Sequence, residues 1–133
     1  MSVLTALRLE LANNPGELAK ALHAIAQANV NIHAVAGVAT GQSSVIELLP
    51  NNVIAATSAL QQIGYQPREV EVAVTWVPNR PGTLLQACEA IAAAGINIDA
   101  VYVVATDPTL GVQLTFEARD AQRVDQILGS VEY

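Results

Sequence analysis

The sequence predicts an α+β protein made of two tandem ferredoxin-like units, each with the element order βαββαβ, an antiparallel sheet and helices on one sheet face. Two observations lead to this fold class. The second half of the chain repeats the first, and both halves show strand-like and helix-like patterns in the same order. The composition agrees, because 52% of the 133 residues are hydrophobic and only 14% are charged, as expected of a chain that buries a core.

The repeat is visible without gaps when residues 13–35 are aligned with residues 79–101. Of the 23 aligned positions, 13 are identical, including both copies of Asn-x-Pro-Gly-x-Leu. Chance does not plausibly produce such agreement in a chain this short. The shift of 66 residues is about half the chain length, so one structural unit is used twice.

Each predicted element follows from the spacing of apolar residues. Alternating apolar residues over 7–11 predict a half-buried first strand, and apolar residues at helical spacing over 18–25 predict a helix that ends at Asn29. The second half repeats both kinds of pattern, with Val70, Val72, Val74 and Trp76 alternating with Glu71 and Thr75, and with apolar residues at helical spacing over 84–91 before Gly95 ends the helix. We expect second strands at Ile32–Ala39 and Ile98–Ala105, third strands at Val45–Leu49 and Val112–Ala118, and second helices near Val53–Ile63 and Ala121–Leu128.

The two units meet without a linker. A fourth strand near Tyr65–Val70 ends the first unit, which predicts domains at 1–69 and 70–133. The fourth strand of the first unit and the first strand of the second are expected to be nearly continuous. In the second unit only Ser130–Tyr133 remains for a fourth strand.

Charge and composition exclude several classes of partner. The net charge is −6 and the six Lys and Arg residues are scattered, which argues against nucleic acid as a partner. No leader and no apolar run of membrane-spanning length is visible, so we expect a cytoplasmic protein with no membrane partner. Cys88 is the single cysteine, so it cannot form an internal disulfide, and its place in a helical apolar pattern predicts a core position.

The loop before each first helix carries the clearest binding chemistry. Pro15 suits the first helical position, and Gly16 would let a ligand approach the backbone closely. The N–H groups and positive end of the helix would then face a carboxylate. Asn13 adds a donor and an acceptor, which suits a zwitterion. The second loop offers the same groups through Asn79, Pro81 and Gly82.

The same residues allow a purely structural reading. Asn14-Pro15-Gly16-Glu17 is also typical of a helix cap with a reciprocal Glu. The repeat shows that the unit needs this segment, but it does not decide between cap and ligand site.

The order of a strand, Asn-x-Pro-Gly-x-Leu, an amphipathic helix and then Asn-Ile opening a second strand resembles the ACT domain, in two copies that cover nearly the whole chain. The resemblance implies binding of a free amino acid or similar metabolite at the first loop, against a neighbouring ACT domain, and regulation of amino-acid metabolism. It nominates Asn13, Asn14, Pro15, Gly16, Leu18, Asn79, Arg80, Pro81, Gly82 and Leu84, with Asn31, Ile32, Asn97 and Ile98 alongside.

The sequence departs from the common ACT pattern in two ways. Asn stands at 13 and 79 where Asp is frequent, and we expect no attached catalytic or DNA-binding domain. The ligand and the regulated target therefore stay unassigned. His33 and Asp99 occupy equivalent second-strand positions and are further possible ligand contacts, against the alternative of solvated strand residues.

The sequence leaves three functions to compare. The first is an allosteric amino-acid sensor, and the alternative is a regulator that docks on a target protein, with or without a ligand. An enzyme is disfavoured, because the chain has no Cys-x-x-Cys, metal-spaced His pair, phosphate-binding Gly-rich loop or credible acid–base pair. We therefore expect no catalytic residue, cofactor or metal.

The second strand of such a unit lies at a sheet edge, and here both copies are apolar on both faces. An edge of this kind predicts pairing with another unit and therefore a homodimer. The alternative is a monomer in which the two repeats cover each other's edges.

Overall fold

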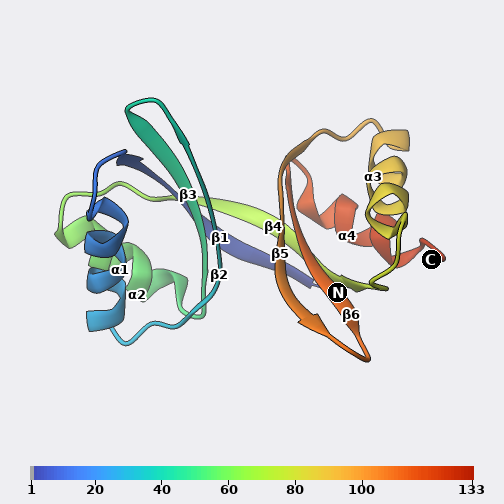
Figure 1. Cartoon of the computed structure of the whole chain (residues 1–133), viewed down its shortest axis with the longest axis horizontal. Coiled ribbons are helices and arrows are strands. Elements are labelled where there is room, and N and C mark those ends of the chain that lie inside the picture. The colour runs from blue at the N-terminus through green and yellow to red at the C-terminus, as the bar shows by residue number, and fades with distance from the viewer. Residues whose placement is uncertain (1) are drawn as a thin grey trace. The chain divides into compact units, whose positions relative to one another are not determined.

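The computed structural model describes residues 2–133 and contains two compact units (Figure 1). The first unit comprises Thr5–Val70. The second comprises Glu71–Tyr133 together with the start of the chain up to Leu4. The α+β fold class predicted from the sequence is confirmed, while the separability of 1–69 and 70–133 as domains stays a prediction.

The first unit contains a sheet and two helices. Strands β1 (Ser2–Ala12), β2 (Ile32–Thr40) and β3 (Ser43–Pro50) are joined by the start of β4 (Arg68–Val77), in the order β2-β3-β1-β4. Helices α1 (Glu17–Gln27) and α2 (Val53–Gln62) lie side by side on one face of this sheet (Figure 1). Their buried side chains pack against β1 and β3 to form the core, which contains Leu7, Leu9, Leu11, Ala21, Ile25, Ile46, Leu48, Ala56 and Leu60.

The second unit repeats this arrangement. It contains β4, β5 (Ile98–Asp107), β6 (Gly111–Ala118) and the first residues of β1, in the order β5-β6-β4-β1. Helices α3 (Thr83–Ala93) and α4 (Ala121–Gly129) pack on one sheet face. Its core includes Ala73, Val77, Ala87, Ile91, Leu114, Phe116, Val124 and Leu128, with Cys88 partly buried against it.

Of the two predictions about fourth strands, one is confirmed and the other is wrong. The fourth strand of the first unit and the first strand of the second are one continuous strand, β4, as expected. The expected fourth strand at Ser130–Tyr133 is wrong, because no strand follows α4. The first residues of β1 stand next to β4 instead, and Tyr133 packs against the second core.

The strand directions position the loop of interest. In the first unit β1 and β2 both pair antiparallel with β3, so they run parallel to each other. Their carboxyl ends therefore lie at the same end of the sheet, and the loop after β1 adjoins the turn after β2. Within residues 2–133 no helix is long and apolar enough to cross a membrane.

Candidate functional site

The two β–α loops share one backbone conformation. Gly16 and Gly82 have φ values of 87° and 89°, in the left-handed region that favours glycine. One hydrogen bond closes each loop at the same place: Glu17 N–H donates to the Asn14 carbonyl oxygen at 3.3 Å, and Thr83 N–H donates to that of Arg80 at 3.3 Å. The repeat in sequence is therefore a repeat in backbone geometry.

This geometry corrects two expectations about the loop. Pro15 is not the first helical residue, because α1 begins at Glu17 with Gly16 as its N-cap. The helix cap with a reciprocal Glu is also wrong, since no side chain caps α1. The Glu17 carboxylate instead accepts a hydrogen bond from the Tyr65 hydroxyl at 2.9 Å. The N-terminus of α1 is thus left without a side-chain acceptor for its first N–H groups.

Gly16 is required for its backbone conformation. A Cβ built on Gly16 or Gly82 would meet no atom within 4 Å, so both positions are open in space. The left-handed φ, and not a crowded neighbour, demands glycine there.

Asn13 ties the first loop to the β2–β3 turn. Its backbone N–H donates to the Gln42 carbonyl oxygen at 2.8 Å, and its side-chain Nδ2 donates to the Gly41 carbonyl oxygen at 2.9 Å. The side-chain amide oxygen of Asn13 takes part in neither of these two bonds, so it is available to accept a hydrogen bond. Asn13 therefore holds the loop in place and brings an acceptor to it.

A cavity of about 400 Å³ lies between this loop and the edge strand β2. The loop and the first turn of α1 form one wall, and β2 with β3 forms the other. Of the residues predicted from the sequence, it brings together Asn13, Asn14 and Leu18. Its lining consists of Ala12, Asn13, Asn14, Glu17, Leu18, Val35, Gly37, Val38, Ala39, Ser44 and Ile46.

The second loop has different surroundings. A cavity of about 480 Å³ lies between the end of β4 and the β5–β6 turn, and Asn79 is the one predicted site residue that lines it. The Arg80 guanidinium donates to the Tyr133 carbonyl oxygen, at 2.6 Å. In the turn, hydrogen bonds from the N–H groups of Leu110 and Thr109 hold the pKa of the Asp107 carboxyl below its usual value.

The starts of the second strands do not join the loop of their own unit. Ile32 and Ile98 begin β2 and β5, at the opposite end of the sheet from the β–α loops, and both pack against a core. Asn31 N–H donates to the Asn51 side chain at 3.0 Å, and Asn97 Nδ2 donates to the Asp99 carboxylate at 3.1 Å. Within a single unit, therefore, these residues do not lie beside the loop, and the expectation from the sequence is wrong there.

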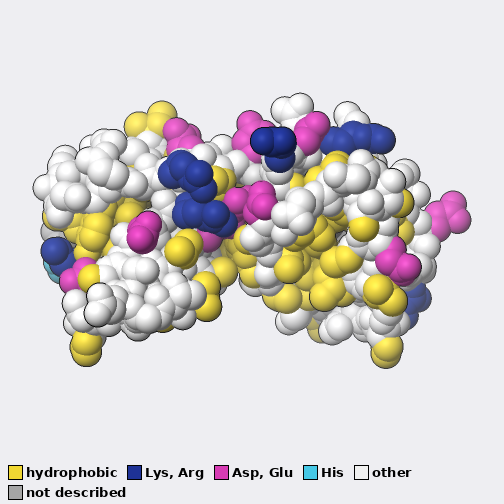
Figure 2. All heavy atoms as spheres, turned by 90° about the horizontal axis from the view of Figure 1, so that it is seen from above, with side chains coloured by type: hydrophobic (Ala, Val, Ile, Leu, Met, Phe, Trp, Pro, Cys, Tyr) yellow, Lys and Arg dark blue, Asp and Glu magenta, His cyan; other side chains and the backbone are white. Residues whose placement is uncertain are grey.

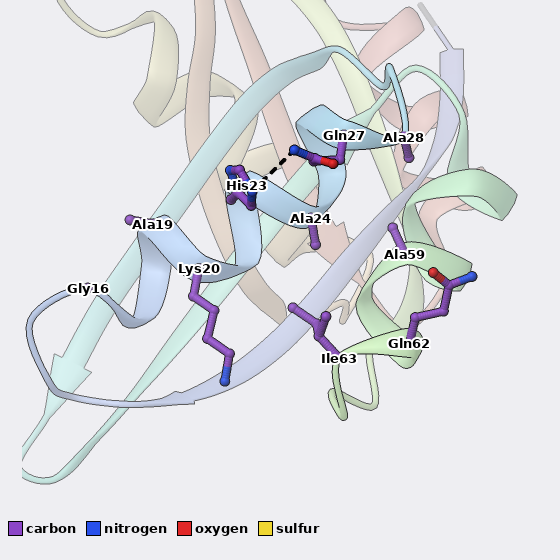
Figure 3. A pocket seen from close by; sticks show the side chains of 10 residues that line it. All are labelled: Gly16, Ala19, Lys20, His23, Ala24, Gln27, Ala28, Ala59, Gln62 and Ile63. Atoms are coloured by element: carbon purple, nitrogen blue, oxygen red, sulfur yellow. Dashed lines mark hydrogen bonds between the residues drawn. The ribbon is translucent and has the colours of Figure 1, made fainter.

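A larger cavity of about 790 Å³ was not anticipated from the sequence. It is a groove between α1 and α2, and the side chains around it come from these helices and their ends (Figure 3). Lys20 Nζ lies 5.5 Å from the centre of the Tyr65 ring, and the His23 ring is 3.3 Å from Gln27 Nε2. Gly16 is the one predicted site residue in its lining.

Both edge strands expose apolar side chains. In β2 the exposed fractions of Val35 and Val38 are 53% and 63%, and in β5 those of Val101 and Val103 are 44% and 53%. β2 and β5 are the outermost strands of their units, which confirms the predicted edge positions. Figure 2 shows hydrophobic side chains exposed on both units. His33 and Asp99 are also exposed, near the start of each edge strand.

Comparison with known proteins identifies the fold family. The family model of the ACT domain matches residues 72–132, which make up nearly all of the second unit. The first unit shares the motif, the loop geometry and the sheet order of the matched one. No curated protein matches the sequence significantly.

Solved structures agree with this assignment. Protein BT0572 from Bacteroides thetaiotaomicron superposes with a TM-score of 0.84 at 20% identity, covering 96% of this chain and 87% of that one. The ligand-free regulatory subunit of aspartate kinase from Thermus thermophilus gives a TM-score of 0.71 at 15% identity, covering 97% and 96%. The regulatory subunit of aspartate kinase from Thermus flavus gives 0.65 at 15% identity, covering 97% and 95%. At these identities the likeness is one of fold.

Proposed function

We propose that this protein is an amino-acid sensor that regulates amino-acid metabolism and binds its ligand at a β–α loop where two ACT domains meet. The cavity between the first loop and edge strand β2 carries the proposal. It combines an uncapped helix N-terminus, which attracts a carboxylate, with amide and carboxylate oxygens suited to an ammonium group. The aspartate kinase regulatory subunits share this fold and support a regulatory role.

The exposed edge supports a site shared between two copies. If β2 pairs antiparallel with β2 of a second copy, the start of each strand comes to lie beside the end of the other. Asn31 and Ile32 of one copy would then approach the loop of the partner, although they are remote from their own loop. A homodimer of this kind would close the cavity and cover Val35.

The alternative is a regulator that docks on a target protein through the same exposed strands. The apolar side chains of β5 favour it, because Val101 and Val103 are exposed on the edge strand of the second unit. Neither function needs catalysis, and among residues 2–133 no group of three His, Cys, Asp or Glu side chains could hold a metal ion. We propose a non-enzymatic protein that needs no cofactor and acts in the cytoplasm.

A thermal-shift screen of the intact chain against the common amino acids tests the sensor. A ligand at one hundred times its dissociation constant should stabilise the protein by about 2.7 kcal/mol. Asn14→Asp is a useful companion variant, because it adds a negative charge to the cavity and should weaken binding of a carboxylate. Absence of any shift, together with co-purification of a specific protein, would favour docking instead.

A further inference from the structure

The strand pairs beside the two β–α loops differ at one pair of facing residues. Gly37 in β2 is opposite Ile46 in β3, whereas Val103 in β5 is opposite Leu114 in β6. A Cβ built on Gly37 would lie 2.5 Å from Ile46 Cδ1, so the Ile46 side chain occupies the space above the glycine. The second unit carries three more side-chain carbon atoms at the corresponding pair.

The first pair of residues lines a cavity, and the second pair does not. Gly37 and Ile46 both line the 400 Å³ cavity, and neither Val103 nor Leu114 lines the cavity at the second loop. The φ of Gly37 lies outside the left-handed region, so its backbone would accept a side chain. Glycine is used here for space and not for conformation, in contrast to Gly16.

A second difference lies in where the carboxylate of each cavity stands, because Glu17 begins the helix beside the first loop whereas Asp107 lies at the β5–β6 turn of the second cavity. Glu17 is half-buried, lines the first cavity and is held by the Tyr65 hydroxyl. The equivalent residue is Thr83, which is 3% exposed and belongs to the interior. The first cavity therefore has one carboxylate and no Lys or Arg in its lining. Its apolar lining includes Leu18 on α1 and, on the opposite wall, Val35 and Ile46.

From these differences we infer that the chain binds a neutral amino acid with an aliphatic side chain, at the first loop and not at the second. The inference rests on the proposed function. The ligand's ammonium group is attracted by Glu17, and its side chain lies against the apolar wall. An acidic amino acid would bring a second carboxylate close to Glu17 with no cation to pair it, so it is disfavoured.

Isothermal titration calorimetry of the intact chain tests this, with L-leucine, L-valine and L-methionine as probes against L-aspartate and L-lysine. We expect one aliphatic ligand per chain, bound about tenfold or more tightly than either charged probe. Gly37→Val would displace the Ile46 side chain that lines the cavity and should weaken binding about tenfold or more, whereas Val103→Ala should leave binding unchanged.

If Gly37→Val does not give the circular dichroism spectrum of the folded protein, Leu18→Asn replaces it. Leu18 lines the cavity and is 38% exposed, so it tolerates a polar side chain. The matched control is Leu85→Asn on α3, where the side chain is 62% exposed and does not line the first cavity. Leu18→Asn should weaken the binding of L-leucine and Leu85→Asn should not.

The outcomes separate this inference from the proposed function. Two ligands per chain, a preference for L-aspartate or L-lysine, or normal affinity after Gly37→Val and Leu18→Asn would overturn the inference and leave the sensor function standing. If no amino acid binds, both are wrong.

Discussion

The two β–α loops share one backbone conformation and differ in the side chains and cavities beside them. Gly16 and Gly82 have nearly equal φ and ψ, and the same hydrogen bond closes each loop. The first loop is fastened to the β2–β3 turn by Asn13 and borders an open cavity, while Arg80 in the second is fastened to Tyr133. The repeated motif therefore accounts for how the chain turns into a helix. Its neighbours decide what the loop can bind.

The largest expected effect concerns the edge strands. Val35→Lys combined with Val101→Lys places a charge on each exposed edge and should convert a dimer to monomer, because an ammonium group disfavours strand pairing. Light scattering at micromolar concentration measures the mass, and ligand titration should show weaker binding. A monomeric wild-type protein, with unchanged affinity in the variant, would exclude the shared-site proposal.

The single variants Val35→Lys and Val101→Lys show which of the two units forms the dimer interface. If β2 alone forms the dimer, Val35→Lys should reproduce the double variant and Val101→Lys should have no effect on mass. The opposite pattern would move the interface to β5, where docking on another protein was the alternative.

The next effect concerns the shared backbone. Gly16→Leu and Gly82→Leu should each lower the free energy of unfolding by about 1–2 kcal/mol, because a residue with a side chain is strained at these φ values. Urea denaturation measures both variants, and equal losses are expected because the two loops are alike.

A smaller effect tests how the first loop is fastened. Asn13→Ala removes the hydrogen bond from Nδ2 to the Gly41 carbonyl oxygen and should cost about 0.5–1 kcal/mol, since the bond is exposed to solvent. It should also weaken ligand binding, whereas Arg80→Ala should not, because Arg80 contacts Tyr133 and lies outside the first cavity. Equal effects of the two changes on binding would contradict the assignment of the site to the first loop.

The sequence predicted the fold closely for a physical reason. Strand and helix periodicities are local, so Leu7, Leu9 and Leu11 mark β1, and apolar residues at helical spacing mark α1. The fourth strand of the second unit was missed because the first residues of β1 stand beside β4, and local pattern does not reveal which distant strand occupies an edge. Ser130–Tyr133 follows the last helix in the sequence, but it forms no strand in the structure.

The candidate site was predicted less completely. Asn13, Asn14 and Leu18 were found from the motif, but Asn31 was placed beside the loop although β2 begins at the opposite end of the sheet. Gly37 gave a usable signal, since a glycine inside a strand often marks a close approach. Its meaning depends on Ile46, which only the strand register brings opposite it.

The smallest expected effect is an acid sensitivity confined to the second unit. N–H groups of Leu110 and Thr109 donate to the Asp107 carboxylate and lower its pKa, so the charged form stabilises the β5–β6 turn. This contribution is complete above the ordinary pKa of 3.8 and is lost as the pH falls through the lowered pKa of the folded state. The β2–β3 turn is built from Gly41 and Gln42 and has no such carboxylate. NMR of backbone amides during acid titration should therefore show local shifts at Thr109 and Leu110 that Asp107→Asn removes, while the amides at Gly41 and Gln42 stay unchanged in the same pH range. Equal shifts in both turns would mean that the acid response belongs to the whole fold and not to Asp107.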